Sequence, residues 1–264
     1  MSPLALALTF IVAVIITLIV LNERIGLFAA ADHFSSPLAK GLAYGWLALF
    51  MLLLTVQITA SAQNPMTAQQ LANTPFYALF GLHIVLVIFL AGWWLLSGRP
   101  NLGQFFNIKR DGVGNAVLTG AAVGLGGWVV TIAAAFLIAL IVTRLGIMPK
   151  NPKPPAAIAF IAAMPVWKKI AIVFSAMTVE ELFYRGWLQK RVGLIASTLL
   201  FALSHSGFGQ PLLLVGVFVI STIIGTAFYR TKNLIPGVIA HGVFDAVQLF
   251  VIIPIVFKAT GIGG

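Results

Sequence analysis

Three groups of ionisable residues interrupt the apolar C-terminal part of this 264-residue chain. In order, they are Glu180-Glu181 with Arg185, then His205, then His241 with Asp245. A charged side chain at the centre of a bilayer costs ~2.5–3.5 kcal/mol on insertion scales, so residues of this kind usually mark a functional site. Glutamate and histidine together can transfer protons, activate water or bind a metal. These groups are the candidate chemical centre.

The spacing inside the groups indicates which side chains share a helix face. Glu181 and Arg185 are four residues apart and can pair, and so can His241 and Asp245. Pairing makes a buried Arg185 tolerable, and a carboxylate beside His241 can orient its imidazole. Glu180 lies about 100° around the helix from Glu181 and cannot share the same partner equally well. A desolvated carboxyl group without an adjacent cation suits a general base or acid.

Composition indicates where these groups lie. The chain is 60% hydrophobic and 8% charged, whereas soluble domains carry about 25% charged residues. This composition predicts an integral membrane protein. The net charge of +10 comes mostly from Lys and Arg between the apolar stretches, where such residues set topology and contact lipid headgroups, so it does not indicate a nucleic-acid partner. The absence of cysteine excludes disulfides and thiolate chemistry.

A helix needs about 20 apolar residues to cross the hydrocarbon core, and the chain offers about eight such stretches. We expect them near 3–21, 42–60, 76–96, 116–142, 170–188, 192–205, 212–229 and 234–256. The predicted fold class is therefore an all-α, polytopic membrane helical bundle of about eight transmembrane helices. The N-terminal stretch lacks a basic segment before it and is interpreted as a first span, not as a removed signal.

Three regions follow from this pattern. Residues 1–145 hold the N-terminal transmembrane helices, 146–169 form a basic, proline-rich connector, and 170–257 hold the core helices that carry the three ionisable groups. Gly120 and Gly124 have the spacing that lets membrane helices approach closely. His83, alone in the third span, is interpreted as a packing residue with no assigned role. Five tryptophans near helix ends are expected to be interfacial anchors: Trp46, Trp93, Trp94, Trp167 and Trp187.

The three groups can meet only if they reach similar depths in the membrane. Measured from the side of Lys190 and Lys232, helices with a rise of 1.5 Å per residue put Glu180 about 15 Å deep and His205 about 20 Å deep. On the same scale His241 lies about 10 Å deep and Asp245 about 16 Å deep. A common site near the middle of the bilayer is therefore geometrically plausible.

The motifs Glu180-Glu181-x-x-x-Arg185, Phe201-x-x-x-His205 and His241-x-x-x-Asp245 resemble, in order, those of the CAAX protease and bacteriocin-processing (CPBP, or Abi) family. This family includes the type II CAAX prenyl endopeptidases. The resemblance covers roughly residues 170–256. It implies an intramembrane endopeptidase acting on membrane-associated or lipidated, CAAX-like proteins, and a multi-pass location in a cell membrane, expected to be a prokaryotic inner membrane.

The resemblance also implies roles for single residues. Glu180 and His205 would activate the attacking water, His241 and Asp245 would stabilise the oxyanion, and Glu181 with Arg185 would brace the site. The family's prenyl endopeptidases typically carry asparagine where this chain has Asp245. An ionised Asp245 cannot donate to an oxyanion, so it would orient His241 or bind a metal, and the substrate class stays open.

The involvement of a metal also stays open. Glu180, His205, His241 and Asp245 could complete a catalytic zinc set with an open position. The HExxH helix of many zinc proteases is absent, and we favour a water activated by glutamate, which needs no cofactor.

Two other classes of protein remain as alternatives. An ion- or proton-coupled transporter could use the same residues as a relay, but no internal repeat is evident. A catalytically silent immunity or scaffold protein could keep the fold, although Glu180 and both motif histidines are present.

Overall fold

Helices make up all the regular secondary structure of the residues that the structure describes, which are 3–28, 32–146 and 155–260. In this computed structural model the α-helices are α1 (Pro3–Ile25), α2 (Pro37–Gln63), α3 (Ala68–Ala72), α4 (Gly81–Leu96), α5 (Leu102–Phe106), α6 (Val113–Arg144), α7 (Ala156–Ala162), α8 (Val166–Ser175), α9 (Lys190–Ser204), α10 (Pro211–Thr231), α11 (Leu234–Val247) and α12 (Ile253–Thr260). Short 3₁₀-helices occur at η1 (Phe76–Phe80) and η4 (Ser206–Phe208). Three segments are π-helical: η2 (Ala176–Glu180), η3 (Leu182–Gln189) and η5 (Gln248–Ile252). The predicted all-α fold is confirmed.

Six helices in the described part of the chain are long and apolar enough to cross a membrane. They are Ala5–Ile25, Pro37–Gln63, Phe76–Leu96, Val113–Arg144, Pro211–Thr231 and Leu234–Ala259. The other two predicted spans, 170–188 and 192–205, are helical but differ in character. The first lies in the charged run α8–η2–η3, and the second lies in α9, which has 15 residues, fewer than the ~20 that span a bilayer.

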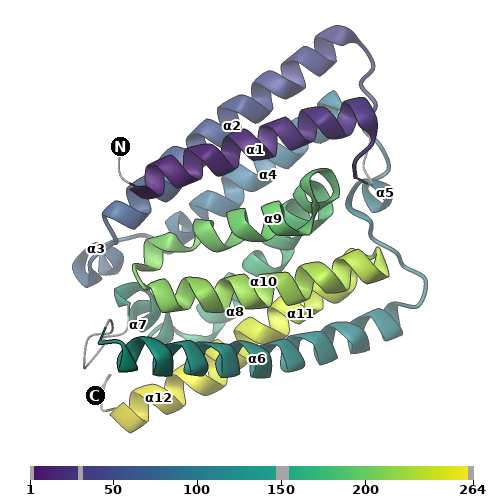
Figure 1. Cartoon of the computed structure of the whole chain (residues 1–264). Coiled ribbons are helices and arrows are strands. Elements are labelled where there is room, and N and C mark those ends of the chain that lie inside the picture. Colours follow the sequence, from purple (N-terminus) through teal and green to yellow (C-terminus); the bar gives the residue numbers. More distant parts are fainter. Residues whose placement is uncertain (1–2, 29–31, 147–154, 261–264) are drawn as a thin grey trace.

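The helices are arranged in two groups with α9 between them (Figure 1). The helices α1, α2 and α4 pack together on one side, and α6, α10 and α11 pack together on the other. Because α9 contacts both α1 and α10, it joins the two groups. The run α8–η2–η3, which carries the first ionisable motif, also lies inside this arrangement, with η2 in contact with α4 and α11. The first ionisable motif is thus surrounded by helices from both halves of the chain.

Glycines allow α6 to approach α10 and α11 closely. A Cβ atom built on Gly120 would lie 2.6 Å from Ile239 Cβ, and one on Gly124 would lie 2.7 Å from the Ala240 carbonyl oxygen. These separations are well below the ~3.5–4.0 Å at which carbon atoms pack best, so only glycine fits. The close approach predicted from the spacing of Gly120 and Gly124 is therefore present, and its partner is the helix that carries His241.

The chain turns inside α9, at Gly193. This residue has φ 78° and ψ 177°, a combination that is essentially restricted to glycine. The ring of Phe28 would lie 2.8 Å from a Cβ atom at this position, so a side chain is excluded on steric grounds as well. The turn lets α9 run back along η3 and carry His205 toward the depth of Glu180.

A buried ion pair fixes the same end of the bundle. Asp32 accepts hydrogen bonds from Arg191 Nε at 2.8 Å, from Arg191 Nη2 and from Trp93 Nε1 at 3.1 Å. Burial by itself raises the pKa of Asp32, but the Arg191 guanidinium and the Trp93 N–H together lower this pKa below its ordinary value. The charged carboxylate therefore ties the segment before α2 to the start of α9.

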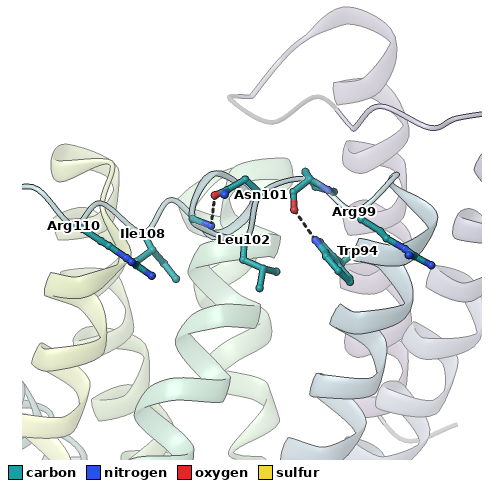
Figure 2. A pocket seen from close by; sticks show the side chains of 8 residues that line it. Trp94, Arg99, Asn101, Leu102, Ile108 and Arg110 are labelled. Carbon is teal, nitrogen blue, oxygen red and sulfur yellow. Dashed lines mark hydrogen bonds between the residues drawn. The ribbon is translucent and has the colours of Figure 1, made fainter.

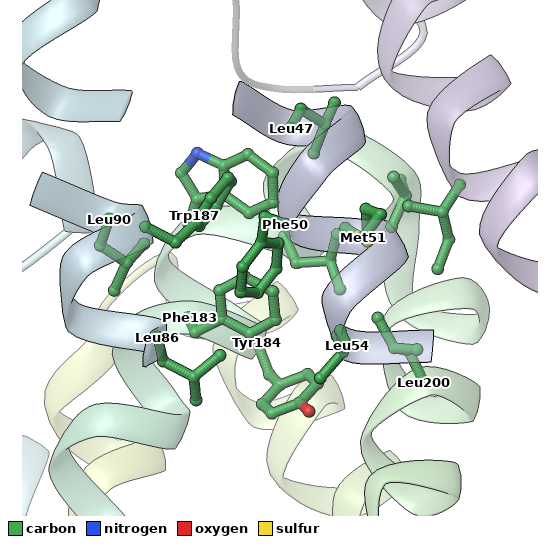
Figure 3. Packing of buried hydrophobic residues seen from close by; sticks show 14 of the residues in the cluster. Leu47, Phe50, Met51, Leu54, Leu86, Leu90, Phe183, Tyr184, Trp187 and Leu200 are labelled. Carbon is green, nitrogen blue, oxygen red and sulfur yellow. The ribbon is translucent and has the colours of Figure 1, made fainter. Parts of the chain in front are cut away.

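Large aromatic side chains hold η3 against α2 and α4 (Figure 3). The Phe183 ring meets Phe50 of α2 edge-on with centroids 5.4 Å apart, and Trp187 meets Phe89 of α4 edge-on at 4.8 Å. Trp93 and Trp187 are fully buried, so their prediction as interfacial anchors is wrong. They lie near helix ends, but the two rings meet edge-on with centroids 5.1 Å apart and are part of the hydrophobic core. Trp167 is 61% exposed, as an anchor should be.

A cavity of ≈ 630 Å³ lies next to α5 (Figure 2). Its lining residues are Trp94, Arg99, Pro100, Asn101, Leu102, Gly103, Ile108 and Arg110. The Trp94 indole donates to the Pro100 carbonyl oxygen at 2.7 Å, and Asn101 accepts from the Gly103 N–H at 2.9 Å. These lining residues include no carboxylate and no histidine, so this cavity is not the candidate active site.

The predicted connector 146–169 lies partly outside the described residues, which omit 147–154. Its described part contains α7 and the start of α8, and α7 packs against α3. The helices before and after the connector pack closely, since α6 lies against α10 and α11 and α1 lies against α9. The boundaries at 145 and 170 remain predictions.

Candidate active site

The two adjacent glutamates lie on the run α8–η2–η3, at a place where its geometry departs from an α-helix. The segment Ala176–Glu180 is π-helical, and so is Leu182–Gln189. π-Helical turns are rare and are frequent at functional sites. Because η2 packs between α4 and α11, Glu180 and Glu181 find partners on different helices, with Glu180 contacting α4 and Glu181 contacting α11.

Glu181 is fully buried and lies between the side chains of Arg185 and His241. Its Oε1 is 2.9 Å from Arg185 Nη1 and 2.9 Å from His241 Nδ1. The contact to Nη1 is an ion pair and not an aligned hydrogen bond. Arg185 Nη2 donates to Ser221 Oγ at 2.9 Å, and the guanidinium lies over the Phe201 ring at 4.5 Å. The predicted pairing of Glu181 with Arg185 is present.

His241 lies between two carboxylates. Its Nδ1 donates to Glu181 Oε1, and its Nε2 is 3.4 Å from Asp245 Oδ2. The second distance exceeds the ~2.7–3.2 Å of an ordinary N–H···O hydrogen bond. The Asp245 side chain is 30% exposed, whereas His241 is buried. Nε2 therefore faces the more open side of the site, and in the doubly protonated ring it can donate to a second acceptor.

Glu180 has an asymmetric environment. Its Oε1 lies 3.1 Å from His83 Nε2 on α4, whereas its Oε2 is buried without a hydrogen-bond partner among the described residues. Glu180 also interacts electrostatically with His205 and His241. The carboxylate thus has one oxygen held by the protein and one buried oxygen free to accept a proton.

His83 is the site residue that the sequence analysis missed. It was interpreted as a packing residue, but it contacts Glu180, the candidate general base. A signal was available, because a lone histidine inside an apolar span is itself an intramembrane ionisable residue. Its partner could not be found from sequence, since 97 positions separate the two residues.

His205 caps the C-terminal end of α9, and its hydrogen bonds show which ring nitrogen carries the proton. Its Nδ1 lies 2.9 Å from the Phe201 carbonyl oxygen, which can only accept, so Nδ1 carries the proton. In the neutral ring Nε2 then holds the lone pair, and no described residue hydrogen-bonds to it. The Phe201 ring lies 4.8 Å from the His205 ring and 5.9 Å from the His241 ring. The Phe201 ring thus packs beside both histidines.

The described residues do not form a metal site. They contain no group of three or more His, Asp, Glu or Cys side chains placed to hold an ion. His241 presents its nitrogens to two carboxylates, and His205 has Nδ1 committed to a carbonyl oxygen. The zinc set proposed from Glu180, His205, His241 and Asp245 does not fit this arrangement, and we derive no step through a metal.

The fold and site together define a polytopic membrane bundle with ionisable residues buried between its helices, among them both carboxylates of the first motif and His241. Residues 162–247 match the family model described as type II CAAX prenyl endopeptidase Rce1-like. The match places a domain of this kind at these residues and supports the CAAX protease family that the three motifs predicted. It includes all six predicted site residues and excludes His83. No curated protein and no solved structure matches the chain.

Proposed function

We propose that the protein is an intramembrane endopeptidase that hydrolyses peptide bonds of membrane-associated or lipidated proteins with a water activated by Glu180. The observation that carries this proposal is the asymmetric Glu180 carboxylate, with Oε1 held by His83 and Oε2 buried without a hydrogen-bond partner in the described part of the chain. A buried polar atom that lacks a partner requires an explanation. A role in accepting a proton during the reaction provides one.

The proposed reaction transfers one proton through Glu180. The water gives a proton to Glu180 Oε2 while its oxygen bonds to the carbonyl carbon of the substrate, and the carbonyl π electrons move to the oxygen. When the C–N bond then breaks, Glu180 returns the proton to the leaving nitrogen. His205 supports the water through Nε2, since its Nδ1–H is held by the Phe201 carbonyl.

The oxyanion would be stabilised by His241. Its Nε2 is 3.4 Å from Asp245, so in the doubly protonated ring, with Nδ1–H held by Glu181, the Nε2–H can donate to a developing negative charge. Removing one such donor typically costs 10²–10³-fold in kcat. Asp245 would orient His241 and would not itself donate. Glu181 and Arg185, both almost fully buried, would hold His241 through its Nδ1–H.

The proposal also includes a membrane-associated substrate, contact with membrane lipids and a location in a prokaryotic inner membrane. A multi-pass membrane protein is supported by the six apolar helices. A lipidated or otherwise membrane-anchored substrate is in keeping with a site buried between them, because such a substrate partitions into the bilayer beside the site.

Cleavage in proteoliposomes tests the proposal. Purified protein is incubated with a pool of lipidated and unlipidated membrane peptides, and new termini are read by mass spectrometry. We expect Glu180→Gln to abolish cleavage, while Asp111→Asn, at an exposed position, keeps it. Equal cleavage by wild type and Glu180→Gln would remove Glu180 from the mechanism. Proton flux that depends on Glu180, without cleavage, would favour the transporter, and neither activity would favour the scaffold protein.

A further inference from the structure

His83 belongs to α4, outside the segment that matches the protease family. Its side chain is 14% exposed, and each ring nitrogen has one polar partner. Nε2 lies 3.1 Å from Glu180 Oε1, and Nδ1 lies 2.7 Å from Ser175 Oγ on α8. The ring of Phe80 packs beside the imidazole at 6.3 Å. The three partners fix the position of the ring and the roles of its nitrogens.

The chemistry of the partners assigns the proton. An ionised Glu180 can only accept, so Nε2 carries the hydrogen and donates it to Oε1. In the neutral ring Nδ1 is then the acceptor, and the Ser175 hydroxyl donates to it. The hydrogen bonds therefore run in one direction: the Ser175 hydroxyl donates to His83, and His83 donates to the Glu180 carboxylate.

We propose that His83 is a positioning residue that holds the Glu180 carboxylate through its Nε2–H, so that Oε2 faces the attacking water. This inference rests on the proposed function, because it assigns a task to the same carboxylate. Without the donor both Glu180 oxygens would be buried and unpaired among the described residues. The carboxylate would then rotate toward other donors. A displacement of 1 Å in a reacting group can cost about 10²-fold in rate.

A positioning role predicts a specific pattern among variants. His83→Leu removes the donor and keeps a comparable volume, so we expect kcat to fall about 10–100-fold with little change in KM. In His83→Gln the side-chain amide can still donate to Oε1, so we expect most of kcat to return. Ser175→Ala leaves Nε2–H in place but frees the other tautomer, so we expect an intermediate loss. His33→Leu, at an exposed position, is the matched control and should keep full activity.

The outcomes separate this inference from the proposed function. If wild type cleaves nothing, the proposed function fails. If wild type cleaves and His83→Leu retains its kcat within about twofold, the positioning role is overturned while the proposed function stands. Equal losses in His83→Leu and His83→Gln would also overturn it, because a donor alone would then not suffice.

A second measurement does not depend on cleavage and covers the case in which a His83 variant does not fold. In ¹⁵N-histidine NMR of the wild-type protein, the His83 signals should be those of a neutral ring with the proton on Nε2, and Ser175→Ala should shift the Nδ1 signal. An unprotonated Nε2 would contradict the proposal whatever the activity.

Discussion

Arg185→Met tests how far the buried charge network determines stability. Arg185 is 1% exposed and contacts Glu181 Oε1 at 2.9 Å and Ser221 Oγ at 2.9 Å. Removing one member of a buried ion pair costs about 3–5 kcal/mol, because the other charge is left uncompensated. His241 still donates to Glu181, so we expect the low end, about 3 kcal/mol. This is a factor of about 100 in the folding equilibrium.

The measurement is the free energy of unfolding in lipid bicelles, compared with Arg230→Met, an exposed arginine that should change it by less than about 0.5 kcal/mol. The double variant Glu181→Gln with Arg185→Met leaves no unpaired charge of this pair. We expect it to be more stable than the sum of the two single variants by about 1–3 kcal/mol. A loss below about 1 kcal/mol for Arg185→Met, or strict additivity in the double variant, would refute the reasoning.

Three further predictions concern other features. Asp32→Asn should destabilise the protein by about 3 kcal/mol at pH 7 by leaving Arg191 unpaired. The folded-state pKa of Asp32 is below its ordinary value, so this contribution exists above about pH 4 and is lost as the pH falls through the folded pKa. The stabilities of wild type and variant, measured against pH, should converge there, and a constant difference would contradict this. Gly124→Leu should destabilise by at least about 1–3 kcal/mol through overpacking against Ala240, whereas Gly126→Leu, where a Cβ meets nothing within 4 Å, should be nearly neutral in thermal unfolding. Proteolysis should persist after dialysis against a chelator, since the described residues hold no set of three ligands, and a loss that zinc restores would count against water activation by glutamate alone.

Local patterns predicted the pairs within one helix. The spacing of Glu181 with Arg185 and of His241 with Asp245 was sufficient, because residues four apart share a face, and both contacts are present. Hydropathy alone was sufficient for the long apolar helices, since length and composition decide whether a segment can cross a bilayer. The depth estimate predicted that Glu180, His205 and His241 can meet, and Glu180 interacts electrostatically with both histidines.

Long-range contacts could not be predicted in the same way. The partners of Glu180 and Asp32 lie 97 and 159 positions away, and no periodicity connects such pairs. The burial of Trp93 and Trp187 depends on which helices fold over their ends. The π-helical geometry of η2 and η3 also has no signature in composition, because the sequence does not show which neighbouring helices their side chains contact.

The π-helical turns also matter for comparison with other sequences. A π-helix closes hydrogen bonds to the fifth residue, whereas an α-helix closes them to the fourth. A helix that gains one residue can therefore absorb it as a local bulge and keep both flanks in register. Loss of one residue within Leu182–Gln189 could therefore be absorbed by a return to α-helical geometry, which would leave Glu180 facing α4. Alignments of relatives should accordingly place one-residue gaps inside the π-helical segments on either side of Glu181, whereas loss of a residue from a purely α-helical stretch would rotate one flank by about 100°.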